Sequence, residues 1–212
     1  MKQIITLIFI FFSCLNAYEF KLNNKDIEKI EKSSQKKFII NRLQKYHTLK
    51  QKIKNYNLNR KLGHVNSFLN KVLSKHDIDS KSSIDYWATP KEFLIEGHGD
   101  CEDYVISKYF TLLDLGVDKK HLYFSVVKVK NAQDYHMVLL YLDTKNSVPL
   151  VLDNLSSKVV KLTKRKDLIL KFAFNEIDSY RLNHKGFTKK ININWKDNKW
   201  ETLLERVYEK NE

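Results

Sequence analysis

Cysteine is scarce in this chain of 212 residues, which contains only Cys14 and Cys101. Long hydrophobic runs are missing too, because no segment reaches the ~18 apolar residues that a membrane-spanning helix requires. Internal repeats and low-complexity linkers are also absent from the sequence. The length then fits one ordinary domain with a hydrophobic core, with two small domains as an alternative.

The first 17 residues have the pattern of a secretory signal peptide. A positive start at Lys2 is followed by the apolar run IITLIFIFF and by the small residue Ala17. We therefore predict a signal peptide over 1–17, a single domain over 18–212 and a periplasmic location. The alternative is a lipoprotein in which Cys14 becomes the lipidated first residue. In both cases Cys101 is the lone cysteine of the folded chain, where it is either a buried structural thiol or a reactive one.

The formal net charge of the chain is +13. Without residues 1–17 it is +12, from 37 basic and 25 acidic residues. Such an excess suits nucleic acid or an anionic membrane surface. The lysines, however, are spread along the chain among acidic residues, and no DNA-reading module is recognisable. We predict a soluble basic exported protein without a nucleic-acid partner.

Hydrophobic periodicity predicts helices first and strands later. Helices are expected over 24–56 with a break near Ser33-Ser34, over 60–75, and from Cys101 to Gly116 with Asp100 as N-cap. The polar stretch 74–90 is predicted to be a loop. Strands are expected at 121–129, 135–142, 148–153 and 158–162, followed by a helical or irregular piece at 164–172, a hairpin at 191–200 and a short C-terminal helix. The result is an α+β chain in which the helix that carries Cys101 packs on an antiparallel sheet.

Two polar residues mark the edge of that sheet. His136 begins an otherwise apolar strand face in YHMVLLYL, and Asp153 ends the next strand in VLDN. In an antiparallel pair the start of one strand faces the end of the other, so His136 and Asp153 are expected to lie close together. If the helix that begins at Cys101 points its N-terminus at this edge, the three residues form a Cys–His–Asp arrangement.

Such an arrangement suits nucleophilic catalysis. The sulfur attacks a carbonyl, the imidazole takes the thiol proton, and the carboxylate orients the imidazole. A helix N-terminus and a nearby imidazolium both lower the pKa of a thiol. The alternative is that Cys101 merely packs, His136 is a satisfied core histidine and Asp153 caps a turn.

The stretch DYWATPKEFLIEGHGDCEDYVISKYFTLLDLG over 85–116, followed by YHMVLLY and VLDN, resembles the bacterial transglutaminase-like cysteine proteinases of the LapG type. The resemblance covers about residues 85–155. It implies a papain/transglutaminase-like fold and calcium-dependent proteolysis in the periplasm. The implied substrate is a large surface adhesin cut near its N-terminus, which releases cells from a biofilm. The implied regulator is an inner-membrane receptor for cyclic di-GMP.

Carried over by position, the resemblance makes Cys101 the nucleophile, His136 the general base and Asp153 the orienting acid. The acidic residues beside the cysteine, Asp100, Glu102 and Asp103, are then the calcium ligands. The bound ion would offset the negative charges that otherwise keep the thiol protonated. The alternative for these acids is simple capping of the first helical turn.

The indole N–H of Trp87 is a candidate donor to the oxyanion, and a plain packing role for this tryptophan is the alternative. The backbone N–H of Cys101 is the stronger candidate donor. Two other functions share the same sequence features. A transglutaminase would use the same thioester but pass the acyl group to an amine. A catalytically silent binding protein would use only its basic surface.

Overall fold

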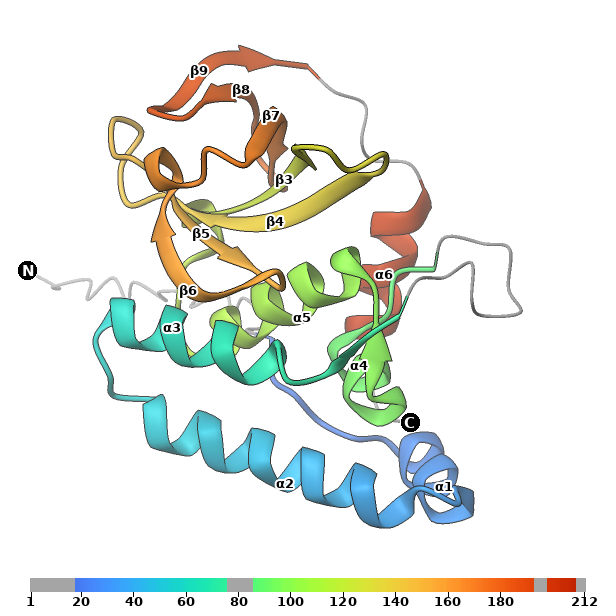
Figure 1. Cartoon of the computed structure of the whole chain (residues 1–212). Helices are drawn as coiled ribbons and strands as arrows, with labels where there is room; N and C mark the ends of the chain where they lie inside the picture. The colour runs from blue at the N-terminus through green and yellow to red at the C-terminus, as the bar shows by residue number, and fades with distance from the viewer. Residues whose placement is uncertain (1–17, 76–85, 193–197, 209–212) are drawn as a thin grey trace, which may run out of the picture.

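The computed structural model describes residues 18–75, 86–192 and 198–208. The described helices are α1 (Asn24–Lys32), α2 (Lys36–Ile53), α3 (Leu58–Leu69), α4 (Pro90–Glu96), α5 (Cys101–Asp114) and α6 (Asn198–Tyr208), with short 3-10 turns at Lys119–His121 and Leu162–Lys164. The described strands are β1 (Leu73–Ser74), β2 (His98–Gly99), β3 (Leu122–Val129), β4 (Tyr135–Tyr141), β5 (Leu150–Asp153), β6 (Ser156–Lys161), β7 (Leu168–Phe174), β8 (Ser179–Asn183) and β9 (Gly186–Ile191). Figure 1 shows most helices below the large sheet, with α5 directly against it.

The N-terminal helices follow from local capping signals. Asn23 accepts a hydrogen bond from the backbone of Asp26, whose side chain accepts one from the Asn23 backbone. This reciprocal capping box fixes the start of α1, and the chain breaks at Ser33 before α2 begins. The predicted helix over 24–56 with a break near Ser33-Ser34 is therefore confirmed.

Two predicted boundaries between residues 58 and 97 are wrong. The helix expected over 60–75 is α3, which ends at Leu69 because the chain then enters β1 and pairs in parallel with β2. Of the loop expected over 74–90, residues 76–85 lie outside the described residues, Ser74 belongs to β1, and Pro90 is the first residue of α4, which the prediction omits. Thr89 caps this helix, Pro90 occupies its first turn, and Gly97 ends it in the left-handed conformation at φ 77°. Proline signals a helix start here, because its missing N–H costs nothing in the first turn.

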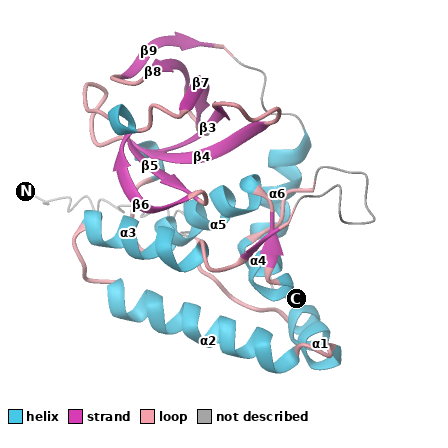
Figure 2. Cartoon of the chain, viewed as in Figure 1, coloured by secondary structure: helices cyan, strands magenta, loops and turns pink. Residues whose placement is uncertain are grey.

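The large sheet has seven strands in the order β6-β5-β4-β3-β7-β8-β9, and all neighbours are antiparallel. Alternation along β4 gives the sheet two apolar faces. Met137 and Leu139 belong to the main core around α5, whereas Val138 and Leu140 belong to a second cluster. The predicted α+β, papain/transglutaminase-like class, with N-terminal helices and a cysteine-bearing helix on an antiparallel sheet, is confirmed (Figure 2).

The C-terminal third differs from the prediction. The helical or irregular piece expected at 164–172 is mainly β7, which pairs with β3 along its length. Strands β8 and β9 were not predicted at all. The hairpin expected at 191–200 is wrong, because β9 ends at Ile191 and α6 begins at Asn198; its turn residue Asp197 lies outside the described residues. The predicted C-terminal helix is confirmed as α6.

The predicted signal peptide lies outside the described residues, so the division into 1–17 and 18–212 stays a prediction. Within the described ranges, every helix is too short or too polar to cross a lipid bilayer.

Candidate active site

The start of α5 is fixed by a network of carboxylates and backbone donors. The Asp100 side chain accepts a hydrogen bond from the Asp103 backbone, and the Asp103 carboxylate accepts one from the Asp100 backbone at 3.2 Å. The other oxygen of Asp103 accepts a 2.7 Å hydrogen bond from the buried N–H of Ala88. The predicted N-cap is therefore confirmed, and Cys101 is the first residue of the helix.

The Cys101 thiol lies in surroundings that favour its protonated form. Its sulfur donates to Oε2 of Glu102 at 2.8 Å. Burial, the charge and hydrogen bond of Glu102, and the charge of Asp100 together raise the pKa of Cys101 well above its usual range. The backbone of Met137 acts in the opposite direction by hydrogen bonding to the sulfur. This contact places the thiol at the start of β4, beside the residue that follows His136.

His136 and Asp153 form a buried pair across β4 and β5. These strands are antiparallel, with Leu139 opposite Leu152 and Leu140 opposite Val151. The His136 Nε2 atom lies 2.8 Å from Oδ1 of Asp153. The carboxylate engages Nε2, so Nδ1 is the ring nitrogen left for proton exchange with another group. The structure thus brings His136 and Asp153 together as the strand pattern predicts.

Arg165 adds a third member to this pair that the sequence did not indicate. Its Nη1 atom lies 2.7 Å from Oδ2 of Asp153, and the N–H of Leu155 donates to Oδ1 at 2.9 Å. Asp167 holds the other side of the guanidinium with hydrogen bonds of 2.7 and 2.9 Å. Burial disfavours the Asp153 charge, but the bonds from His136, Leu155 and Arg165 outweigh it and lower the pKa of Asp153 to about 2.

A second cation, Lys108, lies inside the molecule near the same carboxylate. It is on α5 two turns after Cys101, and its side chain is fully buried. Among the described residues its amine has no hydrogen-bond partner, although it lies 5.6 Å from the centre of the Tyr104 ring. Burial lowers the pKa of Lys108 to about 7, against the opposing charge of Asp153. No sequence signal distinguishes Lys108 from the many surface lysines.

Trp87 lies on the segment that Ala88 ties to the first turn of α5. Its carbonyl accepts a 2.7 Å hydrogen bond from Arg206 of α6. Its indole Nε1 atom is buried and has no hydrogen-bond partner among the described residues. A buried N–H without a partner is uncommon, because leaving it unsatisfied costs free energy. The indole is therefore available as a donor.

The three carboxylates predicted to hold calcium are close in sequence but already engaged. Asp103 accepts backbone hydrogen bonds, and Glu102 accepts a hydrogen bond from the Cys101 thiol. In the three described ranges, no group of three or more acidic, histidine or cysteine side chains is arranged to hold a metal. Carboxylate oxygens are nevertheless the donors that calcium prefers, so the chemistry of Asp100, Glu102 and Asp103 fits this ion. Their role as ligands stays a prediction.

A thiol at a helix start, beside a strand that carries a histidine paired with an aspartate, has the parts of a cysteine protease site. Comparison with known proteins supports this class. The family model described as bacterial transglutaminase-like cysteine proteinase BTLCP matches residues 36–180. No match is found among the curated proteins.

Solved structures extend the similarity over most of the chain. The EGTA-treated LapG of Legionella pneumophila is 31% identical, with a TM-score of 0.70 over 86% of this chain and 96% of that one. The calcium-bound LapG of the same organism is also 31% identical, with a TM-score of 0.69 over 86% of this chain and 97% of that one. The chain belongs to the bacterial transglutaminase-like cysteine proteinase family.

Proposed function

We propose that the protein is an exported, calcium-dependent cysteine endopeptidase that cleaves the N-terminal region of a large cell-surface adhesin and so promotes biofilm dispersal. The observation that carries the proteolytic part is the 2.8 Å pair of His136 and Asp153 beside the strand residue that contacts the Cys101 sulfur. Membership of a cysteine proteinase family supports the same chemistry.

The residues divide the reaction as follows. His136 takes the thiol proton while the Cys101 sulfur bonds to the carbonyl carbon of the substrate, whose oxygen becomes an oxyanion. The Cys101 backbone N–H, which has no acceptor within the helix, and the Trp87 indole donate to that oxyanion. His136 then gives the proton to the leaving amine, and a thioester remains on Cys101.

Water completes the cycle. His136 takes a proton from a water molecule that attacks the thioester carbon. The bond between that carbon and the Cys101 sulfur then breaks, the carboxylic acid product is released, and the proton on His136 returns to the sulfur. Asp153 stays ionised throughout and holds the imidazole in one tautomer and orientation. Arg165 holds Asp153 from the other side, so it acts as a positioning residue.

Calcium is proposed to be held by Asp100, Glu102 and Asp103. The comparison structures of LapG include a calcium-bound and an EGTA-treated form, which supports a role for the ion in this chain. When bound, it supplies positive charge next to the carboxylates that disfavour the thiolate. The hydrogen bond from Cys101 to Glu102 identifies the carboxylate whose charge matters most to the thiol.

The setting of the reaction is also proposed. The signal-like residues 1–17 suit a periplasmic enzyme, and the resemblance to the LapG type suggests restraint by an inner-membrane receptor for cyclic di-GMP. A large repeat-bearing adhesin encoded beside this gene would be the first substrate to test.

The direct test incubates the purified chain from residue 18 with the N-terminal fragment of such an adhesin, in calcium and in EGTA. We expect one discrete cut in calcium, loss of cutting in EGTA, and at least ~10³-fold slower cutting by Cys101→Ala. Incorporation of an amine donor into protein without cleavage would overturn proteolysis in favour of transglutamination. Unchanged adhesin retention on cells that carry Cys101→Ala would favour a silent binding protein.

A further inference from the structure

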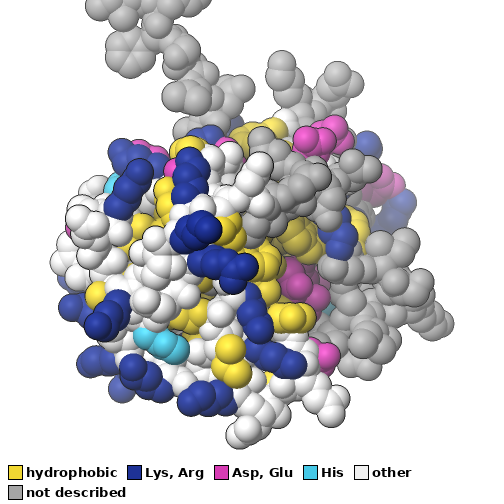
Figure 3. All heavy atoms as spheres, turned by 90° about the horizontal axis from the view of Figure 1, so that it is seen from above, with side chains coloured by type: hydrophobic (Ala, Val, Ile, Leu, Met, Phe, Trp, Pro, Cys, Tyr) yellow, Lys and Arg dark blue, Asp and Glu magenta, His cyan; other side chains and the backbone are white. Residues whose placement is uncertain are grey.

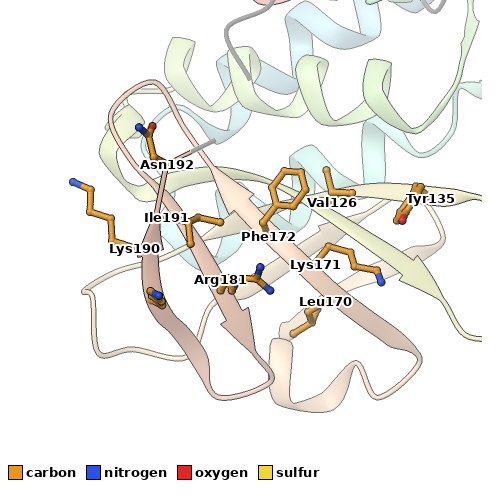
Figure 4. A pocket seen from close by; sticks show the side chains of 10 residues that line it. Val126, Tyr135, Leu170, Lys171, Phe172, Arg181, Lys190, Ile191 and Asn192 are labelled. Carbon is orange, nitrogen blue, oxygen red and sulfur yellow. The ribbon is translucent and has the colours of Figure 1, made fainter. Parts of the chain in front are cut away.

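A broad groove of about 1,060 Å³ crosses strands β3, β7, β8 and β9 (Figure 4). Its apolar lining comes from side chains on three of these strands, namely Val126, Leu170, Phe172 and Ile191. Its polar lining is dominated by cations on neighbouring strands, namely Lys171, Arg181, Lys189 and Lys190. Tyr135, at the first position of β4, lies at one end of the labelled side chains in Figure 4.

The groove adjoins β4, the strand that carries His136. Val126 is paired with Met137, whose backbone contacts the Cys101 sulfur, and on its other side with Phe172. Tyr135 directly precedes His136 in the chain. A polypeptide lying along the groove would therefore pass within one strand of the residues assigned to catalysis.

The groove has an excess of positive charge. Lys171, Arg181 and Lys189 are exposed, and none of them makes an ion pair with another described residue. Only Lys190 is paired, with Asp178. Aspartate and glutamate do not contribute to the described lining. On the face seen from above, Lys and Arg side chains also cover more of the visible described surface than acidic ones do (Figure 3).

Tyr135 strengthens this positive end. Tyr135 is 65% exposed, and the amines of Lys128 and Lys171 each lie 5.9 Å from the centre of its ring. Neither lysine makes an ion pair with a described carboxylate, so both stay available to an anionic partner. The exposed aromatic ring also offers apolar contact to such a partner.

We propose that this groove binds an acidic, partly apolar, extended segment of the protein substrate next to the cleaved bond. The cations supply charge complementarity for carboxylates, and the apolar lining accepts the side chains between them. β9 ends the described sheet, so its outer backbone groups can pair with an extended chain. The outer edge of β9 favours a polypeptide over a nucleic acid, because only a polypeptide has the backbone N–H and C=O groups that continue a sheet. This inference rests on the proposed proteolytic function and names its substrate class.

The test measures binding separately from cleavage. Cys101→Ser protein in calcium is titrated into a fluorescent peptide in which glutamates alternate with apolar residues, and into the same peptide with glutamine in place of glutamate. We expect tighter binding of the acidic peptide, weakening as salt rises. Lys171→Glu combined with Arg181→Glu should weaken binding about tenfold. The matched control, Lys52→Glu with Lys158→Glu, makes the same charge change at exposed lysines on α2 and β6 and should bind normally.

In the cleaving protein, the same Lys171 and Arg181 reversals should raise KM for the acidic substrate far more than they lower kcat. Equal binding of the two peptides, equal loss in the control pair, or tighter binding of an oligonucleotide than of the acidic peptide would overturn the proposal. If the acidic peptide binds and the reversals weaken it but no protein is cut, the groove stands and the proposed proteolytic function fails.

Discussion

The candidate site has one half on the sheet, with His136 and Asp153, and one half on helix α5, with Cys101. The two halves differ in how well their charged groups are matched by partners. On the sheet, Asp153 is bonded to His136, to the Leu155 backbone and to Arg165, and its pKa is lowered to about 2. On the helix, the Cys101 thiol faces Glu102 and Asp100, which raise its pKa. In the proposed mechanism, the base and its orienting acid thus already have their partners, whereas the thiol lies in surroundings that favour its protonated form.

In the proposed mechanism, this difference assigns the control of activity to the start of α5. A change that favours the thiolate must act at the start of α5, because the pair on the sheet already has its partners. Glu102 is the residue where this control is expected, since it accepts the hydrogen bond of the thiol and belongs to the proposed calcium ligands. Without added positive charge at this helix start, the Cys101 thiol should therefore react slowly, although His136 and Asp153 remain in place.

Among changes to the residues that support the His136–Asp153 pair, the largest effect is expected at Arg165. Arg165→Gln should lower kcat/KM by about 10- to 100-fold. Asp153 would lose its ion pair with Arg165, and the His136 imidazole would then lose its fixed orientation. Arg165→Lys should recover only part of this loss, since an ammonium lacks the fork that holds Asp153 and Asp167 together. The measurement is kcat/KM as a function of pH.

Asp167→Asn is the matched control for this change. Its side chain is 47% exposed and touches the far side of the guanidinium, so its loss should reduce kcat/KM by only a few-fold. If Arg165→Gln keeps the wild-type pH profile and rate, Arg165 has no part in positioning Asp153.

The same comparison shows what the sequence can and cannot reveal. The N-cap at Asp100 and the alternation that places His136 on a strand edge are local patterns, so helix start and strand pairing were predictable. Arg165 lies in a short irregular segment that meets Asp153 only through the fold of β5 and β6. No periodicity encodes such a long-range contact.

The missed elements have similar causes. The prediction misses helix α4 because a proline after a polar stretch is typical of a loop end as well as of the first turn of a helix. Strand β7 was obscured by the charged residues that precede it, and its identity depends on pairing with β3. Strands β8 and β9 are short and largely polar, and most of their residues are exposed or half-buried, so no apolar run marks them in the sequence.

The smallest effect is expected on stability, at Lys108, the buried cation near Asp153 that has no hydrogen-bond partner among the described residues. Lys108→Met should stabilise the protein at neutral pH by about 1–4 kcal/mol, because it removes a buried charge without a hydrogen-bond partner. Between pH about 7 and 10 the unfolded chain binds more protons at this lysine than the folded one, so wild-type stability rises with pH.

The advantage of methionine should accordingly be greatest at pH 7 and below and shrink toward pH 10. Denaturant unfolding at several pH values measures it, with Lys52→Met on exposed α2 as the control. A loss of stability at neutral pH would show that the Lys108 amine makes a favourable interaction with Asp153 that exceeds its burial cost.

The central claim is that negative charge at the start of α5 keeps the thiol protonated until calcium offsets it. The direct measurement is the rate of Cys101 alkylation against pH in calcium and in EGTA, which reports one site because Cys101 is the only cysteine of residues 18–212. We expect calcium to move the curve to lower pH by about one unit, and Glu102→Gln to move the EGTA curve in the same direction. Superimposable curves in calcium and EGTA would contradict the account.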